Sequence, residues 1–219
     1  MFRQLITVTL AATLALGFTT QGAAARSFAR PPAAATEDGR VRPSAQRAAL
    51  KKVLTARRAR NLAAFKAYVT AGVYPHNQLT PGELNIWIDD DGHRCAAASM
   101  IWASGEHALV EETAATDNFI RLANVTEGPL LDWILTSGLT HDEVVLIQRP
   151  MMGRDGKLHR PGIRPEPAID WRIAADRSLR LKYDGILEEL ARSKAASLDA
   201  ALDALMAHPE LVTQLLQQR

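Results

Sequence analysis

Apolar side chains return every three or four residues through most of the chain that follows Pro43, a spacing typical of amphipathic helices. The first stripe begins at Ser44, directly after a proline, and Gly72 is placed to end it. A second regular stripe occupies residues 179–190, and further stripes lie on both sides of Pro209. This pattern predicts a mainly α fold with one compact helical domain over residues 44–219.

Two short helices have clear start and stop signals in the middle of the chain. Pro129 is suited to the first position of a helix, and Gly138 is placed to end that helix. Thr140 and Glu143 have the spacing of a capping box, in which each side chain bonds to the other residue's backbone N–H. A helix is therefore expected from this box to about Gln148, before a proline.

One segment departs from the helical pattern. Apolar and polar residues alternate from Leu84 to Asp89, and Asp91-Gly92 is a turn pair favoured in two-residue hairpins. At most one small β-hairpin is therefore expected near residues 84–95, with Ile88 facing Cys95. The alternative is that the chain enters a helix directly near Cys95.

The N-terminus has the three parts of a secretory signal. Arg3 provides a positive charge, Leu5 to Phe18 form an apolar run, and Ala23 and Ala25 provide small residues for cleavage. The apolar run is shorter than the roughly 20 residues that span a bilayer, which disfavours the alternative of an uncleaved anchor helix. We expect export to the periplasm or beyond, with no transmembrane segment after cleavage.

Composition completes the predicted division of the chain. The stretch after the signal is rich in alanine, proline and arginine without periodicity, as in a disordered linker. Glycine, proline and arginine are dense again after residue 150, which predicts a long surface loop. The expected segments are a signal peptide (1–25), a linker (26–43), a helical core (44–150), the loop (151–170) and C-terminal helices (171–219).

Cys95 is the only cysteine, so an intramolecular disulfide is impossible. At the start of a helix its thiolate would be stabilised by the helix dipole, and His93 or His141 could act as a base. This arrangement would suit a thiol-dependent hydrolase or transferase. The alternative is a small buried side chain without chemistry, which is the commoner fate of a free cysteine.

The acidic run Asp89, Asp90 and Asp91 could hold a hard cation such as calcium. An EF-hand is excluded, because its first and last ligand positions would be Trp87 and Ala98. Zinc-ligand spacings and phosphate-binding glycine loops are also missing from the sequence. We therefore expect no cofactor, and regard a solvated acidic turn as the main alternative to a metal site.

Charge is segregated along the chain. Residues 26–82 hold 11 lysines and arginines against 2 acidic residues, whereas residues 83–148 hold 2 against 12. The basic helix at 47–66 could bind an anionic component of the cell envelope or another protein, or it could dock on the acidic segment. The candidate anion-binding residues are Lys51, Lys52, Arg57, Arg58 and Arg60.

Nucleic acid is not an expected partner. The turn at Gly138 has the spacing of a helix-turn-helix, but Asp142 and Glu143 open the second helix. Carboxylates at that position would repel DNA phosphates, and export would remove the partner.

Several motifs between Asn61 and Gln148 resemble an uncharacterised family of exported bacterial proteins. The resemblance implies export and a compact domain, and it transfers no catalytic residue, because the family has no assigned activity. The motifs are Ala71-Gly72-Val73, Asn85-Ile86-Trp87-Ile88-Asp89, Gly92-His93-Arg94-Cys95-Ala96, Asn118-Phe119-Ile120-Arg121, Trp133-Ile134-Leu135, Gly138-Leu139-Thr140 and Ile147-Gln148-Arg149-Pro150.

The sequence contains no complete catalytic constellation, so the leading expectation is a non-enzymatic exported binding or structural protein. The first alternative is the thiol-dependent enzyme built on Cys95. The second is a peripheral cell-envelope binder that uses the basic helix 47–66.

Overall fold

The computed structural model describes residues 43–76, 85–149 and 169–217, and within these ranges it contains eight α-helices and one short 3₁₀ helix. The predicted mainly α fold is confirmed. The elements are α1 (Pro43–Ala71), α2 (Ala96–Ala103), α3 (His107–Asp117), η1 (Leu122–Asn124), α4 (Pro129–Thr136), α5 (His141–Gln148), α6 (Ile169–Arg192), α7 (Lys194–Met206) and α8 (Pro209–Gln217).

Contacts divide the chain into Met1–Arg40 and Val41–Arg219, and all the described residues belong to the second unit. The predicted signal peptide (1–25), the linker up to residue 42 and most of the predicted loop (151–168) lie outside the described residues. None of the described helices combines the length and the apolar character needed to cross a membrane.

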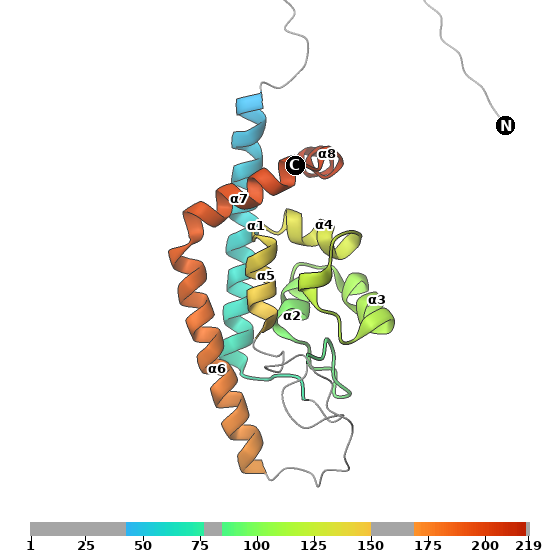
Figure 1. Ribbon diagram of the computed structural model, residues 1–219, viewed down its shortest axis with the longest axis vertical. Helices are drawn as coiled ribbons and strands as arrows, with labels where there is room; N and C mark the ends of the chain where they lie inside the picture. The colour runs from blue at the N-terminus through green and yellow to red at the C-terminus, as the bar shows by residue number, and fades with distance from the viewer. Residues whose placement is uncertain (1–42, 77–84, 150–168, 218–219) are drawn as a thin grey trace, which may run out of the picture. The chain divides into compact units, whose positions relative to one another are not determined.

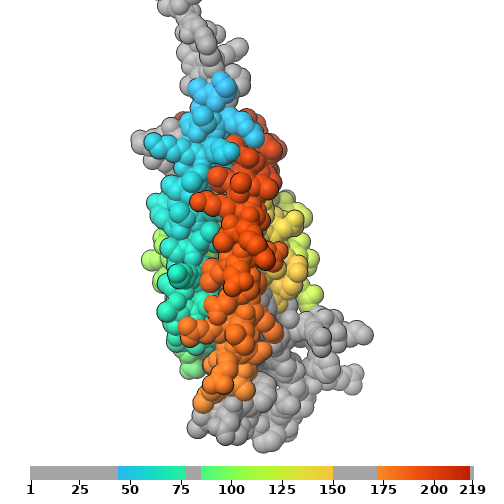
Figure 2. Space-filling view, turned by 90° about the vertical axis from the view of Figure 1, so that its left-hand side faces the viewer, coloured from blue at the N-terminus to red at the C-terminus, as the bar shows by residue number. Residues whose placement is uncertain are grey.

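The long helix α1 organises the second unit. It contacts α2, α6, α7 and α8, so segments from both ends of the domain pack on it. In Figure 1, α6 runs along one side of α1, α7 crosses α1 towards α8, and α2, α4 and α5 lie on the other side. Figure 2 shows the first of these faces, where α6 and α7 lie between α1 and α5.

The sequence signals at the helix ends act as expected. Gly72 follows α1 with a positive φ of 64°, which favours glycine, and Pro129 occupies the first turn of α4. The Thr140 side chain accepts from the Glu143 backbone, and the Glu143 side chain accepts from the Thr140 backbone. The predicted capping box is therefore confirmed, and it fixes the start of α5.

The segment before α2 differs from the expected strand. Within the described residues it contains only an isolated antiparallel bridge between Ile88 and Arg94. Trp87, expected on the polar face, is fully buried, and its indole donates to Val110 O at 3.1 Å. Asn118 binds both backbone groups of Ile88 through its side chain. The Asn118 amide thus satisfies the backbone of Ile88, while the described segment that returns through Arg94 adds only two backbone bonds, Asp89 N–H to His93 O and Cys95 N–H to Trp87 O.

The turn also has a different register from the one expected. Gly92 takes a φ of 81°, its N–H donates to Asp89 O at 3.0 Å, and Asp89 N–H donates to His93 O at 2.9 Å. This pattern is a three-residue loop with glycine in the left-handed position, so Ile88 pairs with Arg94 instead of Cys95. The chain then enters α2 at once, because Cys95 is its N-cap residue.

Two apolar clusters stabilise the unit. The larger joins α1 to α2, α5 and α6 through side chains such as Phe65, Met100, Ile147 and Tyr183. The smaller joins the first half of α1 to α4, α7 and α8 through leucines such as Leu54 and others on those helices. Two helices of this second cluster, α4 and α8, also line the cleft described below.

Candidate functional site

A cleft of about 460 Å³ lies between α1, the α2–α3 junction, α4 and α8. Each helix lines it with residues three or four positions apart, and such residues share one helix face. The volume is within the range of small-molecule sites, about 300–1,000 Å³. The lining positions that bear on its chemistry are Arg57, Arg60, Asn61 and Ala64 of α1, Ser104, Glu106, Leu109 and Glu112 around α3, Asp132, Trp133 and Thr136 of α4, and Leu211, Gln214 and Leu215 of α8.

Hydrogen bonds hold the walls of the cleft in place. The Trp133 indole donates to Ser104 Oγ at 2.9 Å, which joins α4 to the end of α2. The Asn61 amide donates to Ser137 O at 2.9 Å, and Arg57 Nη1 donates to Thr136 O at 3.3 Å. These bonds fix α4 against both α1 and α2, so the cleft is formed without a ligand.

The cleft carries both signs of charge on separate helices. Arg57 and Arg60 lie on α1, whereas Glu106 and Glu112 belong to α3 and its N-cap, and Asp132 belongs to α4. Burial and the neighbouring Arg60 lower the pKa of Arg57, and Glu106 acts in the opposite direction. The two guanidinium groups therefore repel each other at one wall, and a bound anion would relieve that repulsion.

The five predicted anion-binding residues are not gathered on one surface. Arg57 and Arg60 line the cleft, and Lys52 is exposed elsewhere on α1. The Lys51 ammonium pairs with Asp199 of α7 at 2.5 Å. Arg58 is buried, with 1% of its side chain exposed, and pairs with Glu143. The basic helix therefore docks on the acidic segment through Arg58, but it also docks on α7.

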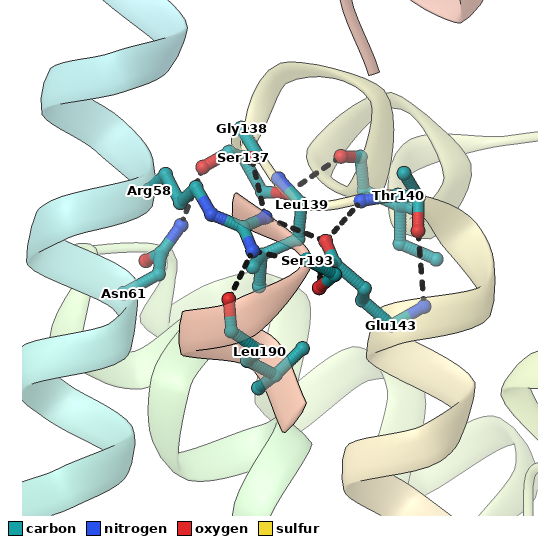
Figure 3. A network of polar contacts seen from close by, with 10 residues as sticks. Arg58, Asn61, Ser137, Gly138, Leu139, Thr140, Glu143, Leu190 and Ser193 are labelled. Atoms are coloured by element: carbon teal, nitrogen blue, oxygen red, sulfur yellow. Dashed lines mark hydrogen bonds and ion pairs between the residues drawn. The ribbon is translucent and has the colours of Figure 1, made fainter. Parts of the chain in front are cut away.

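The Arg58 and Glu143 side chains form a bidentate ion pair inside the unit (Figure 3). Arg58 Nη1 lies 2.6 Å from Glu143 Oε2, and Arg58 Nη2 lies 2.7 Å from Glu143 Oε1. Arg58 also donates to Gly138 O and Leu190 O, and Glu143 accepts from the Thr140 N–H. This network joins α1 to the turn before α5 and to the end of α6, so its role is structural.

Gly138 makes the Arg58 network possible. A Cβ at this position would collide with Leu54 O and would lie 2.8 Å from the Arg58 backbone nitrogen. Its φ of 81° also favours glycine. Only a glycine lets the turn between α4 and α5 approach the backbone of α1 this closely, and this approach positions the α4 wall of the cleft.

Cys95 is fully buried at the N-cap of α2. Its sulfur accepts a long hydrogen bond of 3.5 Å from the Ala98 N–H. Burial raises the pKa of the thiol to about 12, although the N–H groups of the first helical turn act against this rise. The side chain therefore stays in the neutral thiol form at physiological pH, and solvent does not reach it.

Neither candidate base is bonded to Cys95 among the described contacts. The His93 Nδ1 atom lies 3.1 Å from Asp89 Oδ2, and the His141 Nε2–H donates to Leu122 O at 2.7 Å. His141 and the neighbouring buried Gln148 both hold the segment before and within η1. The structure therefore does not assemble a thiol–imidazole pair from these three residues.

Asp89 is engaged in building the turn. Its carboxylate accepts backbone N–H groups from His76, Asp91 and His93, in addition to the His93 ring. Burial acts to raise the pKa of the Asp89 carboxyl, but the hydrogen bonds outweigh it and the pKa lies below its usual range. The carboxylate therefore stays ionised, with its lone pairs directed at the loop.

The predicted acidic turn is only partly a cluster of possible metal ligands. Ligand atoms of Asp89, Asp91 and His93 lie within 4.8 Å of one another, whereas Asp90 does not belong to this group. The four hydrogen bonds accepted by Asp89 account for the geometry without a cation. Asp89 therefore acts in the turn itself, and its side chain, with 3% exposed, is not solvated as the alternative to a metal site expected.

Most of the residues that line the cleft were not predicted as site residues. Glu106, Glu112, Asp132 and Trp133 are the main examples. Each lies on a short helix or at its N-cap, next to an apolar stripe. The only sequence signal for such a site residue is its position beside the stripe. That signal cannot tell which helices meet, because it contains no information on tertiary contacts.

No protein-family model, curated protein or solved structure matches the chain.

Proposed function

We propose that the chain is an exported, non-enzymatic binding domain whose ligand is a small molecule held in the cleft between α1, α3, α4 and α8. The observation that carries this proposal is the cleft itself, with its volume of about 460 Å³ and its mixture of charged, aromatic and aliphatic lining. Concave sites with these properties are where proteins hold small ligands. The hydrogen-bonded walls add support, because a preformed site loses less entropy on binding.

The thiol-dependent enzyme has weaker support than the binding domain. A nucleophilic cysteine needs access to its substrate and a lowered pKa. Cys95 is fully buried and its pKa is raised, and both candidate histidines bond elsewhere. The residues that this alternative requires are used in the fold of α2, the turn before it and the segment around η1.

The envelope-binding alternative is weakened by the use of the basic helix inside the unit. Arg47 pairs with Asp203 at 2.6 Å, Lys51 pairs with Asp199, and Arg58 is buried with Glu143. Three of the cations in this helix therefore already have carboxylate partners. The cations outside these pairs are fewer than the sequence suggests, and one of them, Arg60, lines the cleft.

Binding in the cleft can be tested by NMR with ¹⁵N-labelled protein and mixtures of small anionic, cationic, zwitterionic and neutral compounds. The reporter is the Trp133 indole N–H, identified as the signal that Trp133→Phe removes. We expect at least one compound to shift this signal saturably, together with the backbone signals of Arg60 and Leu215. The Trp87 indole, which is buried on Val110 O, is the internal control and should not move. If no compound shifts the cleft signals, the proposal is wrong.

Export is a separate part of the proposal and rests on the sequence of the first 25 residues. Expression of the full chain in a bacterium, fractionation and intact-mass measurement will test it. We expect periplasmic material that begins at Arg26. Recovery of only uncleaved chain in the cytosolic fraction would contradict export and leave the cleft hypothesis to be tested on its own.

A further inference from the structure

Three charged residues of the cleft are not paired with each other. Within the part of the chain that the structure describes, Arg60, Glu112 and Asp132 form no ion pair, although all three line the same cleft. On the outer side of α1, by contrast, Arg47 and Lys51 pair directly with acidic residues of α7. A cation of α1 and two carboxylates of α3 and α4 therefore line the cleft without an ion pair among the described contacts.

Separated walls of opposite charge discriminate between ligands by their charge pattern. A simple anion would be attracted by Arg57 and Arg60 but repelled by the acidic residues Glu106, Glu112 and Asp132. A simple cation would be attracted by these acidic residues but repelled by the two arginines. A ligand that carries both charges gains both attractions and avoids both repulsions when it lies across the cleft. The arrangement thus selects a dipolar ligand over either ion.

The surface of the cleft between the charged groups is partly apolar. Leu109 of α3, Trp133 of α4 and Leu211 and Leu215 of α8 contribute to it. The Trp133 ring is held in place by its bond to Ser104, so it offers a fixed apolar surface. Apolar surface of this kind favours a ligand whose charged ends are separated by a hydrocarbon body.

We infer that the cleft takes a zwitterionic aminocarboxylate with an apolar body, such as a short peptide of apolar residues. The carboxylate lies at Arg60, the ammonium group lies at Glu112 and Asp132, and the apolar body lies beside Trp133. This inference rests on the proposed function, because it names the class of ligand for the same cleft. Arg60 is suited to the carboxylate end, since a guanidinium group binds a carboxylate with directional hydrogen bonds.

The test uses leucyl-leucine in four forms: free, N-acetylated, C-amidated and blocked at both ends. The four forms share one apolar body and differ only in charge. We expect the free dipeptide to shift the Trp133 indole signal saturably. Each single block should weaken the affinity at least about tenfold, as expected for the loss of one charge-assisted contact. The doubly blocked form should be weaker still.

Two pairs of variants assign the charged ends of the ligand. Arg60→Gln should bring the affinities for the acid and the amide closer together, and Glu112→Gln should weaken the preference for a free amine, although Asp132 remains. The matched controls are Lys66→Gln on α1 and Glu111→Gln on α3, whose exposed side chains lie outside the cleft. Both controls should retain the preferences of the unmodified protein. Loss of a preference in a control variant as well would overturn the assignment.

The outcomes separate this inference from the proposed function. If the blocked dipeptides bind as well as the free form, the cleft binds small molecules but the zwitterionic class is wrong. The same conclusion holds if none of the four forms binds while other compounds shift the cleft signals. If neither the dipeptides nor any other compound shifts the Trp133 signal, both proposals are overturned.

Discussion

Breaking the buried ion pair between Arg58 and Glu143 should destabilise the protein far more than breaking an exposed pair. Only 1% of the Arg58 side chain and 9% of the Glu143 side chain are exposed, and two hydrogen bonds of 2.6 and 2.7 Å join them. In Arg58→Met the Glu143 carboxylate would remain buried without its cation. The carbonyl groups of Gly138 and Leu190 would each lose a donor as well.

The expected magnitude follows from this burial. Removal of one partner of a buried ion pair typically lowers the free energy of unfolding by about 3–5 kcal/mol. We expect Arg58→Met to fall in this range, and Glu143→Gln to lie near its lower end because the amide still accepts from Thr140. The control is Asp203→Asn, which breaks the exposed pair with Arg47 and should cost less than about 1 kcal/mol.

Urea unfolding monitored by circular dichroism provides the measurement, with the double variant completing a mutant cycle. Since each single change strands the other charge, the double change should cost less than the sum, with a coupling energy towards the upper end of about 0.5–3 kcal/mol. Additive effects, or a loss in Arg58→Met no larger than in Asp203→Asn, would refute the structural role of the pair.

Three further predictions concern Gly138, Cys95 and Glu143. Gly138→Ala should destabilise the protein by about 1–3 kcal/mol more than Gly92→Ala in urea unfolding, because both positions have a φ of 81° but only Gly138 meets backbone atoms of α1. Equal losses would show that the close approach is not a constraint. The Cys95 thiol, with its pKa near 12, should react with iodoacetamide only as fast as the protein unfolds; faster labelling of folded protein, followed by mass spectrometry, would contradict its burial. Burial acts to raise the pKa of Glu143, but the hydrogen bonds from Arg58 and Thr140 outweigh it and the pKa is lowered. Its contribution to stability is therefore present above the unfolded-state pKa of about 4.3 and is lost as the pH falls through the folded-state value. The stability difference between the unmodified protein and Glu143→Gln should shrink over that acidic range in urea titrations, and a constant difference would contradict the pairing.

The helices could be predicted because their signals are local. The apolar stripe from Ser44, the glycine after Ala71 and the capping box at Thr140 and Glu143 each depend on residues within a few positions of one another. Local signals of this kind act on the backbone in the same way in many tertiary contexts. The strand from Leu84 was predicted by the same reasoning, and in its described part it failed because Asn118 satisfies the Ile88 backbone from a distant segment.

The tertiary roles of the same residues could not be predicted. Glu143 is the second residue of the capping box, but its carboxylate also meets a guanidinium 85 positions earlier in the chain. Arg58 was grouped with surface cations, because nothing in its neighbours reveals that it is buried. The cleft has the same origin, since its walls come from helices that are separated in sequence and meet only in the tertiary fold.

Three cations within four residues of α1 illustrate why counting charges misleads. Successive helical residues are rotated by about 100°, so Arg57 and Arg60 share one face and Arg58 points away from it. The shared face contributes a cationic wall to the cleft, and Arg58 holds the turn at Gly138 that places α4 on the opposite side. Arg58 therefore helps to position α4, while Arg57 and Arg60 face the cleft that α4 also lines. A basic helix of this kind does not define a single anion-binding surface, because the helical rotation directs Arg58 into the interior and Arg57 and Arg60 into the cleft.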